Sequence, residues 1–312
     1  MRSWLVLAAV LAVGTAAIAD TLRGSVGGEA RSATSLATET AVRRIVPPGV
    51  PNGFMGSVVY SDPGDDCRLH ALRLAGFREA ASPEFRGCRF SLSPDGTTAA
   101  PEGSAWSPLG GVVAVPGRRG FVLHSASGQT VDVRGESPAF KPDGTLTYVH
   151  SGRLVEWTID CARGARLFTV PGDNGTARCL RTVYPHGLAS VAWLTPSRFA
   201  ASSADGEFLL VDNGHIVIRA GLPPHRKAAV AVSPQHRFVN IWLDGELGGT
   251  LTAEGGPVVL PPIGNVRAFA WSPTERWALL ATSRGSVYLF RPGTGDARLR
   301  RLDVTARDLA WR

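Results

Sequence analysis

Short apolar runs separated by turn residues recur along the chain from about residue 54 onwards. One copy has the runs RFAASS (198–203) and EFLLVD (207–212), separated by Asp205-Gly206. The same pattern returns at residues 276–290. Asp-Gly between alternating apolar runs is a strong signal for a β-hairpin. The pattern therefore predicts antiparallel strands joined by tight turns.

A dipeptide of Ala and an apolar residue precedes these runs and recurs six times, mostly just before a Pro. The copies are spaced by 34, 53, 39, 39 and 40 residues, and the longest interval holds an insertion that contains Cys161 and Cys179. Because every copy needs a large side chain at this position, we expect it to pack between neighbouring repeats rather than to stack on a ligand. These blade-packing anchors are Trp106, Phe140, Trp193, Val232, Trp271 and Trp311.

Several repeats add a fourth apolar run, such as HIVIRA (215–220). Four short strands per roughly 40 residues are typical of a β-propeller blade. The chain ends in a first strand without a following blade, and residues 56–74 form a blade without a first strand, so we expect these two parts to pair. The sequence thus predicts an all-β fold, a single propeller of six four-stranded blades closed by the C-terminal strand. Residues 89–96 (RFSLSPDG) are interpreted as the end of the first blade, and a seventh blade is the lesser alternative.

The phrases FSLSPDG, AFKPDGTLTYV and AFAWSPTERWALLATSRGSVYLF resemble the TolB-like and WD40-like β-propeller repeats of exported bacterial proteins. The resemblance covers about residues 54–312. The Gly-His and Trp-Asp signatures of true WD40 repeats are not consistently present, which favours the TolB-like type, and no WD40 partner-binding residue is transferred. The resemblance implies a binding module of the cell envelope, although fold alone does not fix function.

The N-terminus has the layout of a secretory signal. Arg2 precedes an apolar stretch, and Ala17-Ile18-Ala19 offers a small-residue cleavage site before Asp20. We predict a signal peptide at 1–19, a flexible linker at 20–53 and the propeller at 54–312. An uncleaved segment would be an anchor, and the only contact with a membrane. In both cases the propeller lies outside the cytoplasm, as a secreted, periplasmic or outward-facing anchored protein.

Four cysteines are consistent with an oxidising compartment. They permit three connectivities, and we favour sequential pairing because each pair lies within one proposed repeat. Each bridge would add roughly 3 kcal/mol in the chain-entropy model. No Cys-x-x-Cys and no His at zinc-site spacing accompanies them, so we expect disulfides and no metal site. The predicted disulfide cysteines are Cys67, Cys88, Cys161 and Cys179.

The net charge is +7, and 33 residues are Lys or Arg. The arginines are scattered, and no nucleic-acid-binding motif accompanies them, so we expect no nucleic-acid partner. The charge favours acidic partners. We expect a monomer that binds an unidentified protein or an anionic envelope polymer.

Motifs of catalysis are absent: the sequence contains no G-x-S-x-G, H-E-x-x-H, P-loop or G-x-G-x-x-G. The innermost strands read SAW, PAF, VAW, VAV, FAW and LAW, with Asp308 just before the last one. Apolar strands cannot hold a hard divalent cation. We therefore expect a non-catalytic protein without a cofactor. The alternative is a propeller hydrolase or lyase, lactonase-like, with a metal site in loops at the channel mouth.

Long connections on a rigid scaffold are the preferred place for binding residues. The longest predicted connections are 75–103 and 160–190. The second is rich in arginine, and we take it as the candidate partner-binding loop. Its candidate residues are Arg163, Arg166, Arg178, Arg181, Tyr184 and His186.

Overall fold

The structure is a computed structural model of the 312-residue chain. It describes residues 43–44, 56–74, 78–157, 180–185, 187–224, 227–293 and 299–312. The predicted signal peptide lies outside these residues. Within this part of the chain, all regular elements are β-strands apart from one short 3₁₀ turn, Pro63–Asp65. No helix long and apolar enough to cross a membrane occurs within the described residues.

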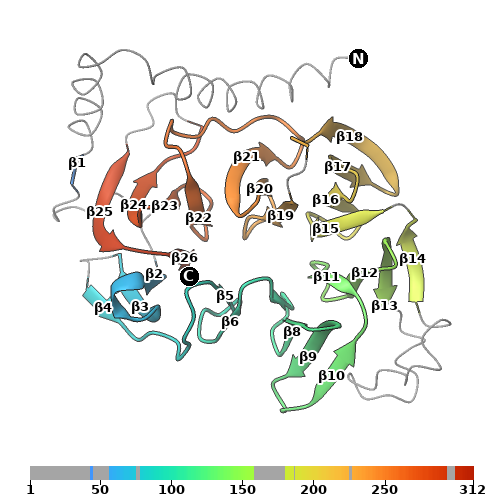
Figure 1. The fold of residues 1–312 in the computed structure, drawn as a ribbon, viewed down its shortest axis with the longest axis horizontal. Helices are drawn as coiled ribbons and strands as arrows, with labels where there is room; N and C mark the ends of the chain where they lie inside the picture. The colour runs from blue at the N-terminus through green and yellow to red at the C-terminus, as the bar shows by residue number, and fades with distance from the viewer. Residues whose placement is uncertain are drawn as a thin grey trace.

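The strands form sheets that follow one another around a ring (Figure 1). Three sheets are consecutive four-stranded meanders, and these are the most regular blades. They comprise β7 (Ala105–Trp106), β8 (Val112–Gly117), β9 (Gly120–Ser125) and β10 (Thr130–Val133); β11 (Glu136–Phe140), β12 (Leu146–His150), β13 (Arg153–Trp157) and β14 (Leu180–Tyr184); and β15 (Leu188–Trp193), β16 (Arg198–Ser203), β17 (Glu207–Asp212) and β18 (His215–Gly221).

Two further blades depart from four strands. One blade has three strands, because the apolar run PVVLPP (257–262) that follows its third strand makes only an isolated bridge between Leu251 and Pro257. The other gains a fifth strand, β1 (Arg43–Arg44), which pairs in parallel with β25 and lies inside the predicted linker. The strands of these blades are β19 (Ala228–Val232), β20 (Phe238–Leu243) and β21 (Glu246–Thr252); and β22 (Val266–Trp271), β23 (Ala278–Thr282), β24 (Ser286–Phe290) and β25 (Arg300–Thr305).

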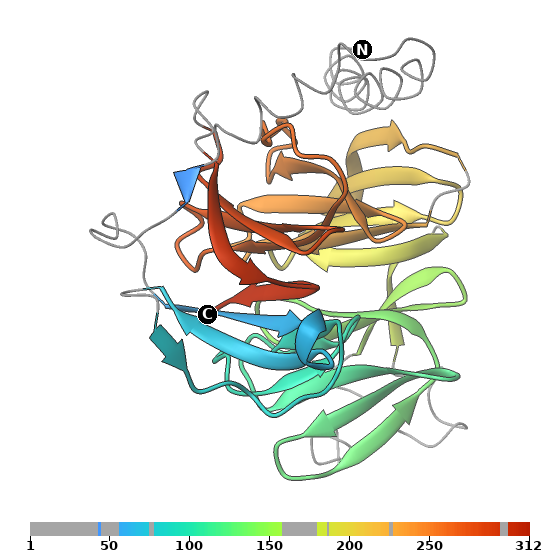
Figure 2. The same cartoon turned by 60° about the vertical axis from the view of Figure 1, so that its left-hand side comes forward.

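The remaining blade closes the ring and confirms the predicted closure. Its order is β26-β2-β3-β4, from β26 (Asp308–Trp311), β2 (Ser57–Asp62), β3 (Arg68–Arg73) and β4 (Arg78–Ala80). Val58 lies opposite Trp311 and Ser61 opposite Asp308. Figure 2 shows the red strand β26 beside the blue strand β2. The six-bladed all-β propeller predicted from the sequence is thus confirmed.

The segment RFSLSPDG is not the end of the first blade, because β4 already is its outer strand. Instead, β5 (Phe90–Leu92) pairs only with β6 (Ala99–Pro101), in a two-stranded sheet between the closing blade and the β7–β10 blade (Figure 1). The Ser-Pro-Asp-Gly turn joins two strands only, because no apolar run for a third strand follows them.

The repeats give the ring two different ends. The turns between second and third strands lie at one end, which we call the disulfide end: residues 63–67, 118–119, 151–152, 204–206, 244–245 and 283–285. The turns between first and second strands lie at the other, and each contains a Pro, so we call it the proline end: residues 93–98, 107–111, 141–145, 194–197, 233–237 and 272–277.

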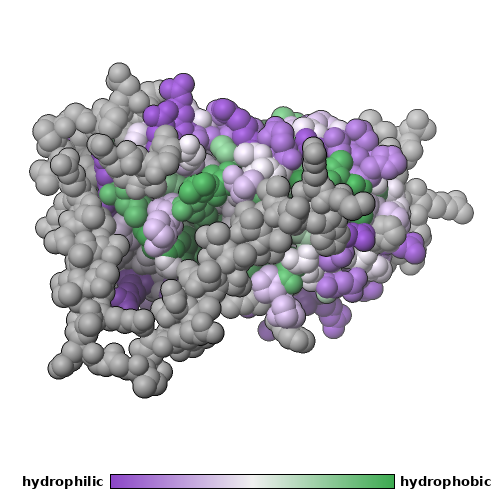
Figure 3. Space-filling model, turned by 90° about the horizontal axis from the view of Figure 1, so that it is seen from above, coloured by the Kyte–Doolittle hydropathy of each residue, from purple (hydrophilic) through white to green (hydrophobic). Residues whose placement is uncertain are grey.

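Apolar side chains fill the spaces between blades. One cluster joins Trp193 to Leu154 and Leu188, and another joins Trp311 to Leu279 of the neighbouring blade. Exposed large apolar side chains are few in the described part: Leu109, Ile216, Val217 and Val259. Figure 3 shows apolar areas separated by polar surface on one side of the molecule.

Candidate functional site

The predicted pairing of Cys67 with Cys88 is confirmed, and it fastens the disulfide end. The bond joins the β2–β3 turn to the residues just before β5, with Cα atoms 4.6 Å apart. Asp66 and Cys67 both take left-handed backbone angles, with φ of 49° and 56°. Cys67 is buried, whereas Cys88 is exposed. The second predicted pair, Cys161 and Cys179, lies outside the described residues.

Asp308 joins the closing strand to β5 beside this disulfide. Its carboxylate accepts hydrogen bonds from the backbone N–H of Phe90, at 2.9 Å, and of Leu309. Ser61 accepts from the Asp308 N–H, and its hydroxyl donates to the Cys88 carbonyl at 2.8 Å. Burial raises the pKa of Asp308 to about 7, since removing water from a carboxylate disfavours its charged form.

Arg89 extends from the start of β5 towards the opposite side of the ring. Its guanidinium lies 2.5 Å from the Glu102 carboxylate. A Cβ placed on Gly245, in the β20–β21 turn, would lie 3.4 Å from both Nη atoms of Arg89. The β5–β6 hairpin therefore reaches the turn of a blade that is not its neighbour. Sequence reasoning missed this role of Arg89, because no local pattern marks a contact across the ring.

Further out, the disulfide end carries exposed arginines. Two carboxylates of this end lie near basic groups, since Glu246 lies 2.9 Å from Arg267 and Asp65 lies 3.0 Å from His70. Asp66 and Asp205 are also exposed in its turns. Six exposed arginines of this end have no ion pair among the described residues. They come from the closing blade, the β7–β10 and β11–β14 blades and the β22–β25 blade: Arg68, Arg118, Arg119, Arg153, Arg284 and Arg307.

The proline end is built from repeated turns with one left-handed position. In five turns a Ser or Lys comes directly before the Pro. The carbonyl of this Ser or Lys accepts a hydrogen bond from the N–H of the residue three positions later. Glycine fills the position at 96, 110 and 144, with positive φ. His236 and Glu275 fill it with φ of 59° and 56°, at a backbone cost that glycine avoids. Both side chains bind the preceding blade.

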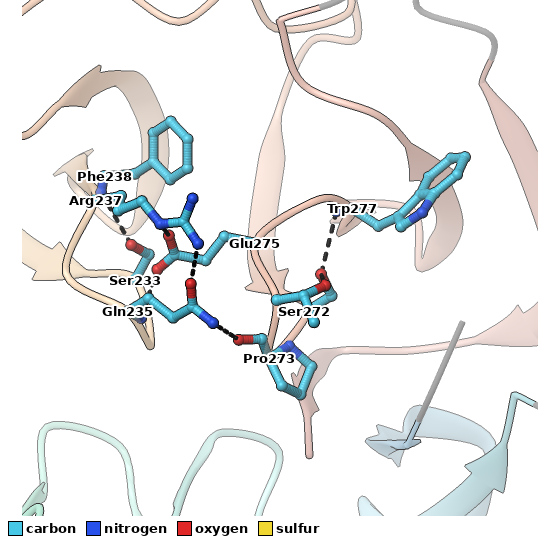
Figure 4. A network of polar contacts seen from close by, with 9 residues as sticks. Ser233, Gln235, Arg237, Phe238, Ser272, Pro273, Glu275 and Trp277 are labelled. Atoms are coloured by element: carbon cyan, nitrogen blue, oxygen red, sulfur yellow. Dashed lines mark hydrogen bonds and ion pairs between the residues drawn. The ribbon is translucent and has the colours of Figure 1, made fainter. Parts of the chain in front are cut away.

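Glu275 makes the larger of these contacts (Figure 4). Its carboxylate accepts from the Gln235 N–H at 2.5 Å and lies 3.2 Å from Nε of Arg237. Gln235 in turn donates to the Pro273 carbonyl at 2.9 Å. The Glu275 side chain is only 1% exposed, and Arg237 is 62% exposed. The network ties the β19–β20 turn to the β22–β23 turn.

The six predicted anchors lie at the ends of first strands, as expected from the repeat. Trp193, Trp271 and Trp311 are buried, while Trp106, Phe140 and Val232 are partly buried. Trp193 also makes a hydrogen bond to the neighbouring blade, in which its Nε1–H donates to the Thr147 hydroxyl at 2.8 Å. Lys141 lies 4.7 Å from the centre of the Trp193 ring and pairs with Glu156. The energetic role of the anchors stays a prediction.

The candidate partner-binding loop is only partly described. Arg163, Arg166, Arg178 and His186 lie outside the described residues, and Arg181 lies on β14 opposite Glu156. Tyr184 is corrected: it is 3% exposed and packs edge-on against Phe199, because β14 faces the next blade there. The predicted connection at 75–103 is not a simple loop either, since it contains β4, β5 and β6.

No group of three or more His, Cys, Asp or Glu side chains that could hold a metal ion occurs among the described residues. Two of the described histidines make hydrogen bonds to backbone carbonyls. His236 donates from Nδ1 to the Trp193 carbonyl, and His150 is hydrogen-bonded to the Arg134 carbonyl. These two side chains make contacts within the fold.

The strand topology defines the molecule as a β-propeller protein. No protein-family model matches the chain, and no curated protein matches it. Among solved structures, the β-propeller domain of Cps50 (Swd1) from Myceliophteria thermophila matches 82% of this chain and 89% of that chain, with 13% identity and a TM-score of 0.43. Dihydro-heme d1 dehydrogenase NirN in complex with DHE matches 84% of this chain and 57% of that chain, with 16% identity and a TM-score of 0.39. Both scores are low, so the fold assignment rests on the topology, and the TolB-like type stays a prediction.

Proposed function

We propose that this protein is an extracytoplasmic, TolB-like β-propeller that acts as an interaction module for an anionic partner, either an acidic protein surface or an envelope polymer. The six exposed arginines of the disulfide end carry the proposal. They lie in turns or at the first strand residue after a turn, on a rigid ring where little ordering entropy is lost on binding. Charges arranged in this way attract an oppositely charged partner and set its orientation.

The location outside the cytoplasm is supported by two observations. The Cys67–Cys88 disulfide is consistent with an oxidising compartment. The N-terminal sequence has the layout of an export signal. We propose that the protein works as a monomer, with the disulfide end as its binding surface.

Two triple variants of equal charge test the binding surface. Arg118→Glu/Arg153→Glu/Arg284→Glu changes the disulfide end, and Arg73→Glu/Arg78→Glu/Arg276→Glu changes exposed arginines of the proline end. The probe is poly-L-glutamate of defined length at two salt concentrations. We expect the first variant to bind at least about tenfold more weakly, a loss that shrinks as salt screens the charges, and the second to bind as the parent does.

Equal weakening of both variants would show that only net charge matters and would overturn the assignment of the surface. Absence of binding by the parent protein would overturn the anionic partner. Crosslinked capture from an envelope extract, followed by competition with poly-L-glutamate, then identifies the natural partner. A metal-dependent hydrolase or lyase stays the alternative prediction from the sequence, and metal analysis of the same preparation tests it.

A further inference from the structure

The β5–β6 hairpin is the least supported sheet of the ring. Both strands have only three residues, and each pairs only with the other. Every blade has at least one further strand outside its second strand. The hairpin thus depends on contacts other than strand pairing to keep its position.

Its start is held by a compact set of contacts at the disulfide end. Cys88 is bonded covalently to Cys67 of the closing blade. The Cys88 carbonyl accepts from Ser61, and the next strand residue, Phe90, donates its N–H to Asp308. All these partners belong to the closing blade, so they attach one side of the hairpin to one neighbour.

The two cysteine residues differ in exposure. Cys67 is buried, with 8% of its surface exposed, whereas Cys88 is exposed. Exchange with a thiol requires in-line approach to one sulfur while the other leaves. Because Cys88 is the more exposed residue, we take its sulfur as the one that a reductant attacks and Cys67 as the leaving group.

We propose that Cys67–Cys88 is a site of thiol–disulfide exchange that controls the position of the β5–β6 hairpin between the closing blade and the β7–β10 blade. A thiolate of a dithiol reductant attacks Sγ of Cys88, and the Cys67–Cys88 bond breaks with its electron pair on Sγ of Cys67, which takes a proton from solvent. The second thiol of the reductant then attacks the mixed disulfide and releases Cys88 as a thiol. Two electrons and two protons reach the protein, and the reductant becomes a disulfide.

Loosening the hairpin moves Arg89, which reaches across to Gly245 in the oxidised form. Arg89 and Glu102 flank the hairpin at the disulfide end, so their pair moves with it. Reduction therefore changes the middle of this end, while blades away from the hairpin keep their packing. This inference does not depend on the proposed partner, because it concerns the hairpin alone.

Hydrogen exchange read by mass spectrometry tests the proposal on the full chain. Cys161→Ser/Cys179→Ser serves as the background, so that Cys67–Cys88 is the only possible disulfide. We expect reduction to speed exchange in residues 88–102 by at least about tenfold, because the disulfide no longer restrains local opening of the hairpin. Residues 188–221 of the β15–β18 blade are the internal reference and should exchange at an unchanged rate. Cys67→Ser/Cys88→Ser in the same background should match the reduced protein.

Unchanged exchange in residues 88–102, with two free thiols verified by mass, would overturn the control of the hairpin. Faster exchange throughout the reference blade would also overturn it, since the bond would then support the whole fold. A monothiol trap decides the site of attack: an adduct on Cys88 is expected, and an adduct on Cys67 contradicts the mechanism. The native chain, reduced without any substitution, gives the same comparison should the background variant fail to fold.

Discussion

The ring of Phe238 lies parallel to the indole of Trp271, with centroids 4.3 Å apart and planes 7° apart. Phe238 begins β20, and Trp271 ends β22 of the next blade. The contact joins the same two blades as the Glu275 network, since Phe238 follows Arg237 and Trp271 precedes the turn that holds Glu275.

Trp271→Ala should remove this contact and leave a cavity between the blades. We expect a loss of about 3–5 kcal/mol in the free energy of unfolding, the usual range for deletion of a buried aromatic side chain. Leu109→Ala, at a side chain that is 74% exposed, is the control and should change stability by less than about 0.5 kcal/mol. Urea unfolding followed by tryptophan fluorescence and by circular dichroism measures both. A Trp271→Ala loss as small as that of the control would refute the anchor role.

Glu275 combines an unfavourable backbone angle with a favourable set of contacts. Glu275→Ala keeps the strain and loses the contacts, whereas Glu275→Gly loses the contacts and relieves the strain. We expect the Gly variant to be more stable than the Ala variant by about 1 kcal/mol, the cost of a left-handed non-glycine residue. Chemical denaturation of the two variants and the parent decides this. An Ala variant that equals the Gly variant would show that the turn changes its backbone angle when the carboxylate is removed.

Asp308 makes stability depend on pH in a definite direction. Its folded pKa, about 7, lies above the ordinary value of 3.8, so the folded protein holds the proton more tightly than the unfolded chain. The resulting stability is fully present below about pH 3.8 and is lost as pH rises through 7. Asp308→Asn mimics the protonated form and should remove a slope of up to about 1.4 kcal/mol per pH unit between pH 5 and 6. Unfolding free energies of parent and variant, measured from pH 5 to 8.5, should converge at acid pH and separate at alkaline pH. Parallel curves would contradict the prediction.

Lys141 and Glu156 form an ion pair with side chains that are only 8% and 14% exposed. Lys141→Met should remove this cation from the Glu156 carboxylate in a poorly solvated place, at a cost of up to about 3–5 kcal/mol. The double variant Lys141→Met/Glu156→Leu should recover most of this loss, because no charge is then buried. A double-mutant cycle by thermal and urea unfolding measures the coupling. Equal stability of the single and double variants would show that water reaches the pair.

The propeller could be predicted from the sequence because its signals are local and repeated. Asp205-Gly206 and Asp244-Gly245 mark hairpins, and the turn glycines and prolines return at the blade spacing. The pairing of β26 with β2 could be predicted by counting strands, because the first blade lacks an innermost strand and the C-terminus provides one. The β5–β6 hairpin was misplaced because its turn resembles those of complete blades, while its missing outer strands leave no positive signal.

The site was harder to predict because its residues meet only in the closed ring. Phe90 and Asp308 are 218 residues apart in sequence, and Arg89 reaches a turn on the far side. Asp308 stands just before an apolar inner strand in the sequence, yet its burial depends on neighbours that no periodicity reveals. Tyr184 does not lie on an exposed loop, because its segment forms strand β14. That strand pairs with β13, which lies on the other side of the insertion in the sequence.

The pairing of β26 with β2 also sets an order of events during synthesis. The Ser61 hydroxyl meets the Asp308 N–H over a separation of 247 residues, so the closing blade cannot be completed until nearly the whole propeller has been made. Until then β2 has an open inner edge, the kind of edge that recruits foreign strands. Contacts of such long range also form slowly. The newborn chain therefore passes through an open, unfinished ring, and this interval is when it is most exposed to proteases and to aggregation.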